Sequence, residues 1–326
     1  MKPLILLLAL ATTAFAQTPL IDGPQKLYSN TTESNDITAT GAHATAGLAR
    51  SAQIAPLDID GQPSPSGKIV LLSIGMSNAS QEWCGLANGC TVGTPVSFMG
   101  VAAAAGEVNH TTLAIVNGAE GGRVAGQWTS PTMDTYDLVR DSRLIPAGLS
   151  EKQVQVIWIK QANANPSIPM PSRQSDAFML EINLAAIARA TKVRYPNLRM
   201  VFLSSRVYGG YAITTLNPEP YAYEGGFSVK WVVESQVAQM RPDSQPPDTR
   251  IGDLDYNTVA PWLAWGPYLW ANGQTPRSDG LTWNPEDFMI DGTHPSDVGI
   301  AKVASMLMSF FTSSHFTRCW FLAVGF

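Results

Sequence analysis

Short runs of apolar residues recur along the chain, and polar or glycine-rich segments separate them. The runs span residues 69–74, 112–116, 154–159 and 198–204. Continuous Val, Ile and Leu runs of this length are typical of strands buried on both faces, and the helical stretches between them imply the crossover connections of a parallel sheet. The pattern predicts an α/β protein, a three-layer α/β/α sandwich with a central parallel sheet. Its ligand site should lie outside the carboxyl ends of the strands.

Two further segments, 177–193 and 295–311, carry apolar residues at helical spacing. In each, the apolar positions recur three or four residues apart, which places them on one face of a helix. The two stripes are Leu180, Leu184, Ile187 and Ala188, and Ile300, Val303, Ala304, Leu307 and Phe311. We expect both helices to pack these stripes on the sheet.

The beginning of the chain differs from the rest. Residues 1–16 have a charged start, a short apolar stretch and a small-x-small ending, which is the pattern of a secretory signal peptide. Residues 17–66 are rich in Thr, Ser, Asn, Ala and Pro, and we expect them to form an extended N-terminal lead-in to one domain spanning 67–326. No later apolar stretch reaches the roughly 18 residues that span a bilayer, so we expect a secreted or periplasmic protein without a membrane segment after cleavage.

Composition narrows the classes of partner. A chain of 326 residues with 45% hydrophobic and 14% charged residues has the composition of a globular protein rather than a disordered or fibrous one. The formal charge is −5, and loss of Lys2 with the signal peptide makes it more negative. That balance argues against nucleic acid and against an anionic membrane as partners.

The chain has three cysteines, Cys84, Cys90 and Cys319. Cys84 and Cys90 flank a short segment in which Asn88-Gly89 can form a turn, so in an oxidising compartment we expect them to form a disulfide, with two reduced thiols as the alternative. The sequence indicates no role for Cys319. No Cys/His cluster has the spacing of a zinc site, and we expect neither a metal nor an organic cofactor.

Ser77 is the first candidate for chemistry. It lies in Gly75-Met76-Ser77-Asn78, directly after the first apolar run, and a strand-to-loop corner is where hydrolases expose a serine nucleophile. Serine is a poor nucleophile without a base and a third group that orients the base. Both are offered much later in the chain by Asp291 and His294, in Asp291-Gly292-Thr293-His294.

Two other loops that follow apolar runs carry residues suited to binding an oxyanion. Gly121 and Gly122 follow the run at 112–116, and a glycine lets a backbone N–H approach a substrate oxygen closely. Asn163 and Asn165 follow the run at 154–159 and offer a side-chain amide at the same rim. The choice within each pair is open at this point.

Taken in order from Ser77 to His294, these four blocks resemble those of the SGNH hydrolases, also called the GDSL esterase/lipase superfamily. The resemblance implies that Ser77 is the nucleophile, with Asp291 and His294 completing a triad. It also implies an oxyanion hole formed by Ser77, Gly122 and Asn163. The first block, Gly-Met-Ser-Asn, is closest to members that resemble carbohydrate and sialic-acid O-acetylesterases, and the third, Gln-Ala-Asn, departs from the family's Gly-x-Asn-Asp.

The substrate is indicated less directly. Four tryptophans fall in a Pro/Gly-broken stretch before the last block, and Trp265 and Trp283 among them are candidate sugar-stacking contacts, with packing as the alternative. Asn78 beside the nucleophile is a further candidate contact. Arg206, just past a strand end, could bind a carboxylate or phosphate, with a structural ion pair as the alternative.

The sequence therefore predicts a secreted serine esterase for short O-acyl esters on small molecules or carbohydrates, acetyl on a carbohydrate being one case. A broad-specificity lipase or arylesterase is one alternative. A non-catalytic carbohydrate-binding or adhesion module with the same fold is the other.

Overall fold

The computed structural model describes residues 17–28, 41–87, 89–244 and 247–323. Five parallel strands form its sheet, in the order β2-β1-β3-β4-β5. The strands are β1 (Ile69–Gly75), β2 (Leu113–Val116), β3 (Val154–Lys160), β4 (Met200–Ser204) and β5 (Trp262–Trp265). The four predicted runs supply the first four strands, and β5 was not predicted, because its Trp-Leu-Ala-Trp sequence is short and stands among prolines and glycines.

The pleat divides the side chains of each buried strand between two cores. On β1, Val70, Leu72 and Ile74 belong to one core cluster, whereas Ile69 and Leu71 belong to the other. Every residue of β1 is buried, which is why the sequence shows a continuous apolar run rather than an alternating one.

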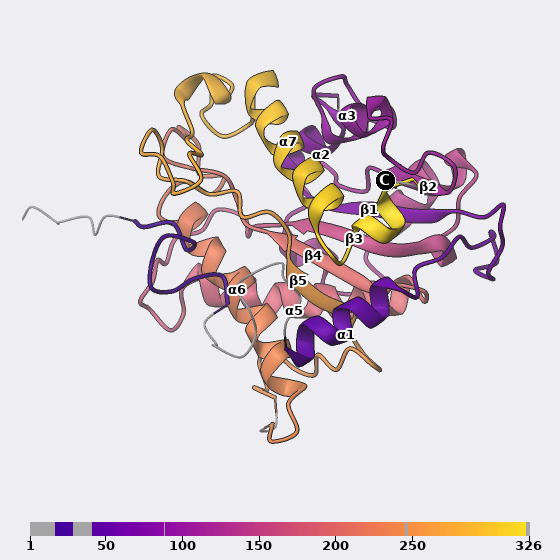
Figure 1. Ribbon diagram of the computed structural model, residues 1–326. Helices are drawn as coiled ribbons and strands as arrows, with labels where there is room; N and C mark the ends of the chain where they lie inside the picture. Colours follow the sequence, from indigo (N-terminus) through magenta and orange to yellow (C-terminus); the bar gives the residue numbers. More distant parts are fainter. Residues whose placement is uncertain (1–16, 29–40, 88, 245–246, 324–326) are drawn as a thin grey trace, which may run out of the picture.

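Helices cover both faces of the sheet, as Figure 1 shows. The first core packs against α5 (Asp176–Arg194) and α6 (Tyr221–Gln239). The second packs against α2 (Ser77–Cys84), α3 (Phe98–Ala104) and α7 (Asp297–Ser313). The predicted three-layer α/β/α sandwich is confirmed.

The predicted helices at 177–193 and 295–311 are α5 and α7, displaced by only one or two residues at each end. The long helix α6 was missed. Gly225 and Gly226 interrupt its apolar pattern, and polar residues such as Lys230 and Gln236 are buried on it, so no single stripe is visible in the sequence. A Cβ on Gly226 would lie 3.2 Å from Leu20, so a small residue lets the beginning of the described chain pack closely here.

The N-terminal lead-in is not wholly extended, because α1 (Ala42–Ser51) lies within it. His43 stacks on Trp262 of β5, with ring centroids 5.0 Å apart, and its Nε2 lies 2.8 Å from the Leu263 carbonyl oxygen. A Cβ on Gly47 would come within 2.4 Å of the Trp262 ring, so this helix rests directly on the end strand. The proposed signal peptide, residues 1–16, lies outside the described residues.

The remaining helical segments are short. They are α4 (Asp134–Val139), α8 (Arg318–Phe321), the 3-10 turns Ala125–Trp128, Ile145–Ala147, Glu151–Gln153 and Pro285–Asp287, and the π turn Arg140–Leu144. Within the described part of the chain, no helix combines the length and the apolar character needed to cross a membrane.

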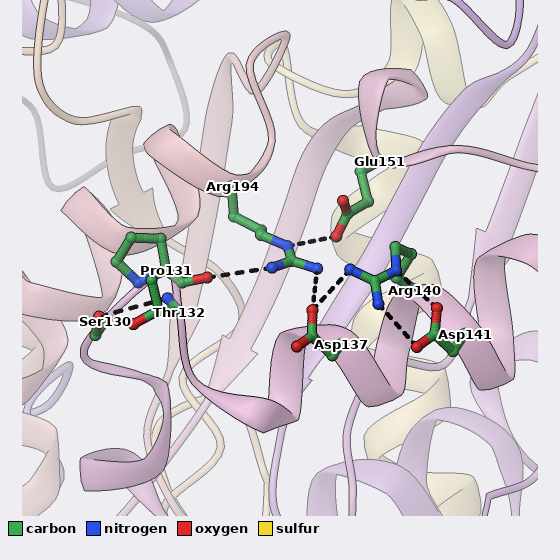
Figure 2. Close-up of polar contacts among 8 residues, drawn as sticks. All are labelled: Ser130, Pro131, Thr132, Asp137, Arg140, Asp141, Glu151 and Arg194. Carbon is green, nitrogen blue, oxygen red and sulfur yellow. Dashed lines mark hydrogen bonds and ion pairs between the residues drawn. The ribbon is translucent and has the colours of Figure 1, made fainter.

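Ion pairs join the carboxyl end of α5 to the segments before β3. Arg194 bonds Glu151 at 2.5 Å and Asp137 at 2.7 Å, and it also donates to the carbonyl of Pro131 at 3.3 Å. Arg140 shares Asp137, as Figure 2 shows. This network lies at the amino ends of the strands, because α5 runs antiparallel to them.

Candidate active site

A sharp turn between β1 and α2 presents Ser77. A Cβ on Gly75 would lie 2.3 Å from the Cβ of Ala79 and 2.6 Å from the carbonyl oxygen of Lys160, so only glycine fits where strand and helix meet. Ser77 is the first residue of α2. The first N–H groups of a helix have no partner within it, and the helix dipole favours negative charge at that end.

Ser77, His294 and Asp291 are brought together although 217 residues separate the serine from the histidine. Ser77 Oγ lies 2.8 Å from His294 Nε2, and His294 Nδ1 lies 2.5 Å from Asp291 Oδ2. A base that bonds the nucleophile through one ring nitrogen and a carboxylate through the other is the arrangement needed to activate a serine.

The loop that carries Asp291 and His294 is a tight turn built on glycine. Gly292 has a φ of 63°, and a Cβ there would lie 1.9 Å from the carbonyl oxygen of Tyr211. Asp291 Oδ1 accepts the backbone N–H groups of Thr293 and His294, each at 3.0 Å. Burial alone would raise the pKa of Asp291, but the hydrogen bonds from His294 and Thr293 outweigh it and hold the pKa below its ordinary value.

An open pocket of about 510 Å³ lies over Ser77. Its walls include Gly121, Gly122 and Asn163 as well as His294. Among the described residues, neither the Gly121 nor the Gly122 backbone N–H has a hydrogen-bond acceptor. Unpaired donors beside a nucleophile can hold the negative oxygen of a tetrahedral intermediate.

Gly122 has a left-handed φ of 76°, a conformation that favours glycine. Gly121 also borders the pocket, so the structure does not choose between the two amides as oxyanion donors. The resemblance to the SGNH blocks favours Gly122.

Of the two asparagines after β3, only Asn163 borders the pocket. Its Oδ1 accepts a bond of 2.9 Å from Asn183, and its Nδ2 lies 3.3 Å from both the carbonyl and the Oδ1 of Asp176. Asn165 is exposed and accepts a bond from Thr215 at 2.7 Å. Its place on the pocket wall therefore favours Asn163 over Asn165 as the side-chain donor.

Arg206 is not placed to contact substrate as we expected, whereas Asn78 borders the pocket with its amide bonded within the protein. Arg206 is 1% exposed and does not border the pocket, and it donates to Asn78 Oδ1 at 2.7 Å. Asn78 borders the pocket, but its Nδ2 donates to the carbonyl of Thr293 at 2.7 Å. The two side chains therefore form consecutive hydrogen bonds from Arg206 through Asn78 to Thr293, the residue before His294.

The expected tryptophan contacts are also wrong. Trp265 is 4% exposed and Trp283 is fully buried, and neither borders the pocket. Trp265 Nε1 donates to the carbonyl of Leu27, and Trp283 Nε1 donates to the carbonyl of Leu269. Trp262 and Trp270 are buried as well. These tryptophans fill the core, because β5 and the segment after it lie under other elements.

Sequence reasoning missed a buried group of charges beneath the site. Glu82 on α2 forms an ion pair with Lys160 at the end of β3, and both side chains are wholly buried. Burial raises the pKa of Glu82. Burial lowers the pKa of Lys160 to about 8, and the positive charge of Arg206 adds to this shift. The negative charge of Glu82 opposes it. The only signal in the sequence was a lysine at the end of an apolar run.

Cys84 and Cys90 form a disulfide that closes a small loop after α2, and Cys319 is a free thiol. Asn88 within the loop lies outside the described residues. Among residues that the structure describes, no group of three or more His, Cys, Asp and Glu side chains is arranged to hold a metal ion.

No family model matches the chain, and no curated protein sequence matches it. Solved structures do show likenesses. The salicylyl-acyltransferase SsfX3 from a tetracycline biosynthetic pathway is 16% identical with a TM-score of 0.35, and the match covers 77% of this chain and 56% of that one. A GDSL-like lipase from Parabacteroides merdae ATCC 43184 is 16% identical with a TM-score of 0.37, and the match covers 74% of this chain and 95% of the lipase.

Phospholipase A1 from Streptomyces albidoflavus NA297 is 11% identical with a TM-score of 0.32, and the match covers 75% of this chain and all of that one. The chain resembles the SGNH hydrolases. Since these TM-scores are low, the functional argument rests on the geometry of this chain's own residues.

Proposed function

We propose that the protein is a carboxylic-ester hydrolase in which Ser77 is the nucleophile. One observation carries the proposal, namely the continuous contact from Ser77 Oγ through His294 to Asp291 at the floor of an open pocket. A module that only bound carbohydrate would have no need for a histidine held in line between a serine and a carboxylate.

The mechanism follows from these contacts. His294 Nε2 takes the proton of Ser77 as Oγ attacks the ester carbonyl carbon, and Asp291 stabilises the resulting imidazolium. The amides of Ser77 and Gly122 and the side chain of Asn163 surround the negative oxygen. His294 then gives the proton to the departing alkoxide, which leaves as the alcohol. A water molecule then attacks the acyl carbonyl as His294 takes its proton, and His294 returns that proton to Ser77 Oγ as the acid leaves.

The pocket lining suits a neutral ester. None of the described side chains that line it is a Lys, Arg, Asp or Glu, and its walls include Met76, Leu86, Leu216 and Met289. Stacking on a sugar ring has lost its support, since the four tryptophans expected to provide it are buried. An acetylated carbohydrate is therefore a weaker candidate than an uncharged ester with apolar parts.

We also propose that the enzyme is exported. The signal-peptide pattern of residues 1–16 supports export, and so does the Cys84–Cys90 disulfide, because disulfides persist in oxidising compartments.

The test is hydrolysis of p-nitrophenyl acetate by the wild type and by Ser77→Ala and His294→Ala. We expect each variant to lose at least about a thousandfold in kcat while staying folded, because the members of a triad act as one unit. Ser66→Ala, an exposed serine in the lead-in, is the matched control and should keep wild-type activity. A folded Ser77→Ala variant with near wild-type kcat would exclude the proposed nucleophile.

A further inference from the structure

The pocket over Ser77 carries solvent-exposed apolar side chains on two different sides. Leu86 is 42% exposed and belongs to the loop closed by the Cys84–Cys90 disulfide. Leu216 is 47% exposed and belongs to the segment after β4. Both border the pocket. A ligand that covers apolar surface at the mouth of a pocket removes it from water, which lowers the free energy of the complex. Both leucines are therefore suited to contact substrate.

Leu216 lies on the same side of Ser77 as His294. Its backbone N–H donates to Thr214 Oγ1 at 3.3 Å, and Thr214 Oγ1 lies 3.0 Å from Thr293 Oγ1, next to the histidine. Met289, which also borders the pocket, donates its N–H to the His294 carbonyl at 2.8 Å. Leu216 and Met289 therefore form an apolar wall beside the base.

Leu86 lies on the other side. Its loop continues α2, and the Cys90 carbonyl accepts a bond of 3.2 Å from Asn117, in the segment after β2. In the sheet, β2 lies on one side of β1, whereas β4, which precedes Leu216, lies on the other. Ser77 stands at the end of β1, between the two leucines.

The chemistry assigns a different part of the ester to each of the two leucines. When Ser77 Oγ has added to the carbonyl carbon, the negative oxygen points to the Gly122 and Asn163 donors. The leaving oxygen must lie within reach of His294 Nε2, because that nitrogen protonates it. The alcohol part of the ester then lies along the Leu216 wall. The acyl chain takes the remaining direction, toward Leu86.

We propose that the substrate is a neutral ester that is apolar on both sides of the scissile bond, with Leu86 selecting the acyl group and Leu216 selecting the alcohol. This inference rests on the proposed function. It assigns the disulfide loop a task, which is to hold Leu86 at the edge of the pocket.

The experiment varies the two halves of the ester separately. The acyl series compares p-nitrophenyl octanoate with p-nitrophenyl acetate, and the alcohol series compares hexyl acetate with methyl acetate. The variants are Leu86→Ser and Leu216→Ser. Leu48→Ser on α1 is the matched control, because Leu48 is 37% exposed and does not border the pocket.

We expect Leu86→Ser to lower the octanoate-to-acetate ratio of kcat/KM about tenfold, the size of effect that apolar contacts in a pocket give, and to leave the hexyl-to-methyl ratio unchanged. Leu216→Ser should do the reverse, and Leu48→Ser should change neither ratio. The double variant Cys84→Ala/Cys90→Ala, which opens the loop, should lower the same ratio as Leu86→Ser.

The inference is overturned if Leu86→Ser and Leu216→Ser change the same ratio, if they exchange roles, or if neither ratio responds. Failure of the proposed function has a different signature, because ester hydrolysis would then be absent or would survive Ser77→Ala. If hydrolysis depends on Ser77 but neither ratio changes in the two leucine variants, the proposed triad stands and the proposed roles of Leu86 and Leu216 are excluded.

Discussion

Asn163 and Asn165 show how finely position decides the role of a residue. Only Asn163 borders the pocket, with its amide held by Asn183 and Asp176. We expect Asn163→Ala to lower kcat by about 10²- to 10³-fold with little change in KM, because an oxyanion donor bonds charge that exists in the transition state. Asn165→Ala is the control and should stay near wild type in steady-state kinetics. The reverse result would move the donor two residues along the loop.

Asn78 is a positioning residue on our interpretation, since its amide joins Arg206 to the Thr293 carbonyl. We expect Asn78→Ala to lower kcat about tenfold with KM little changed, because the loop that carries His294 loses a hydrogen bond. Asn78→Asp can still accept from Arg206 but cannot donate to Thr293. The aspartate variant should therefore recover stability in thermal melts without recovering kcat. Full kinetic recovery in it would show that only the Arg206 contact matters.

At the scale of elements, the Glu82–Lys160 pair joins α2 to the end of β3 under the nucleophile. We expect Lys160→Met to lower the free energy of unfolding by about 3 kcal/mol, because it leaves a wholly buried carboxylate without its partner. The double variant Lys160→Met/Glu82→Gln should cost less than Lys160→Met, since the unpaired charge is then gone. Denaturant titration measures both. A double variant as unstable as the sum of the two single changes would contradict this coupling.

For the whole molecule, stability should depend on pH through carboxyls buried around α5 and α6. Burial raises the pKa of Glu224 to about 7, and the nearby charges of Asp176 and Glu219 add to this shift. The hydrogen bond from the Met170 N–H opposes it. A group with a raised folded pKa takes up protons on folding. The stability that it contributes is complete below its ordinary pKa of 4.5 and is lost as pH rises through about 7.

The free energy of unfolding should therefore decrease between about pH 4.5 and 7, and Glu224→Gln should make that decrease shallower. Denaturant unfolding at a series of pH values checks the slope, with exposed Glu286→Gln as the control. Asp291 acts in the opposite sense, because its folded pKa is lowered and its contribution is lost as pH falls below its ordinary range near 3.8. An unchanged slope in Glu224→Gln would mean that other groups titrate in this window.

The sequence by itself determined the strands β1 to β4, the helices α5 and α7, the sandwich architecture and the loops that meet at the pocket. Buried parallel strands and amphipathic helices leave patterns that depend only on neighbouring residues, so those patterns can be read locally. Ser77, Asp291 and His294 were found in the same way, because a glycine-containing turn at the end of a strand or before a helix is a local signal.

Only the tertiary structure decided which polar and aromatic residues face the pocket. Trp265 and Trp283 were candidate sugar contacts from the sequence, but Trp265 belongs to the buried strand β5 and Trp283 is buried in the segment that follows it. The helix α6 was hidden by Gly225 and Gly226. Arg206 contacts Asn78, a residue 128 positions away, which no local pattern reveals. Burial and pairing depend on which distant segments pack together, and the same side chain binds a ligand or supports the core according to that packing.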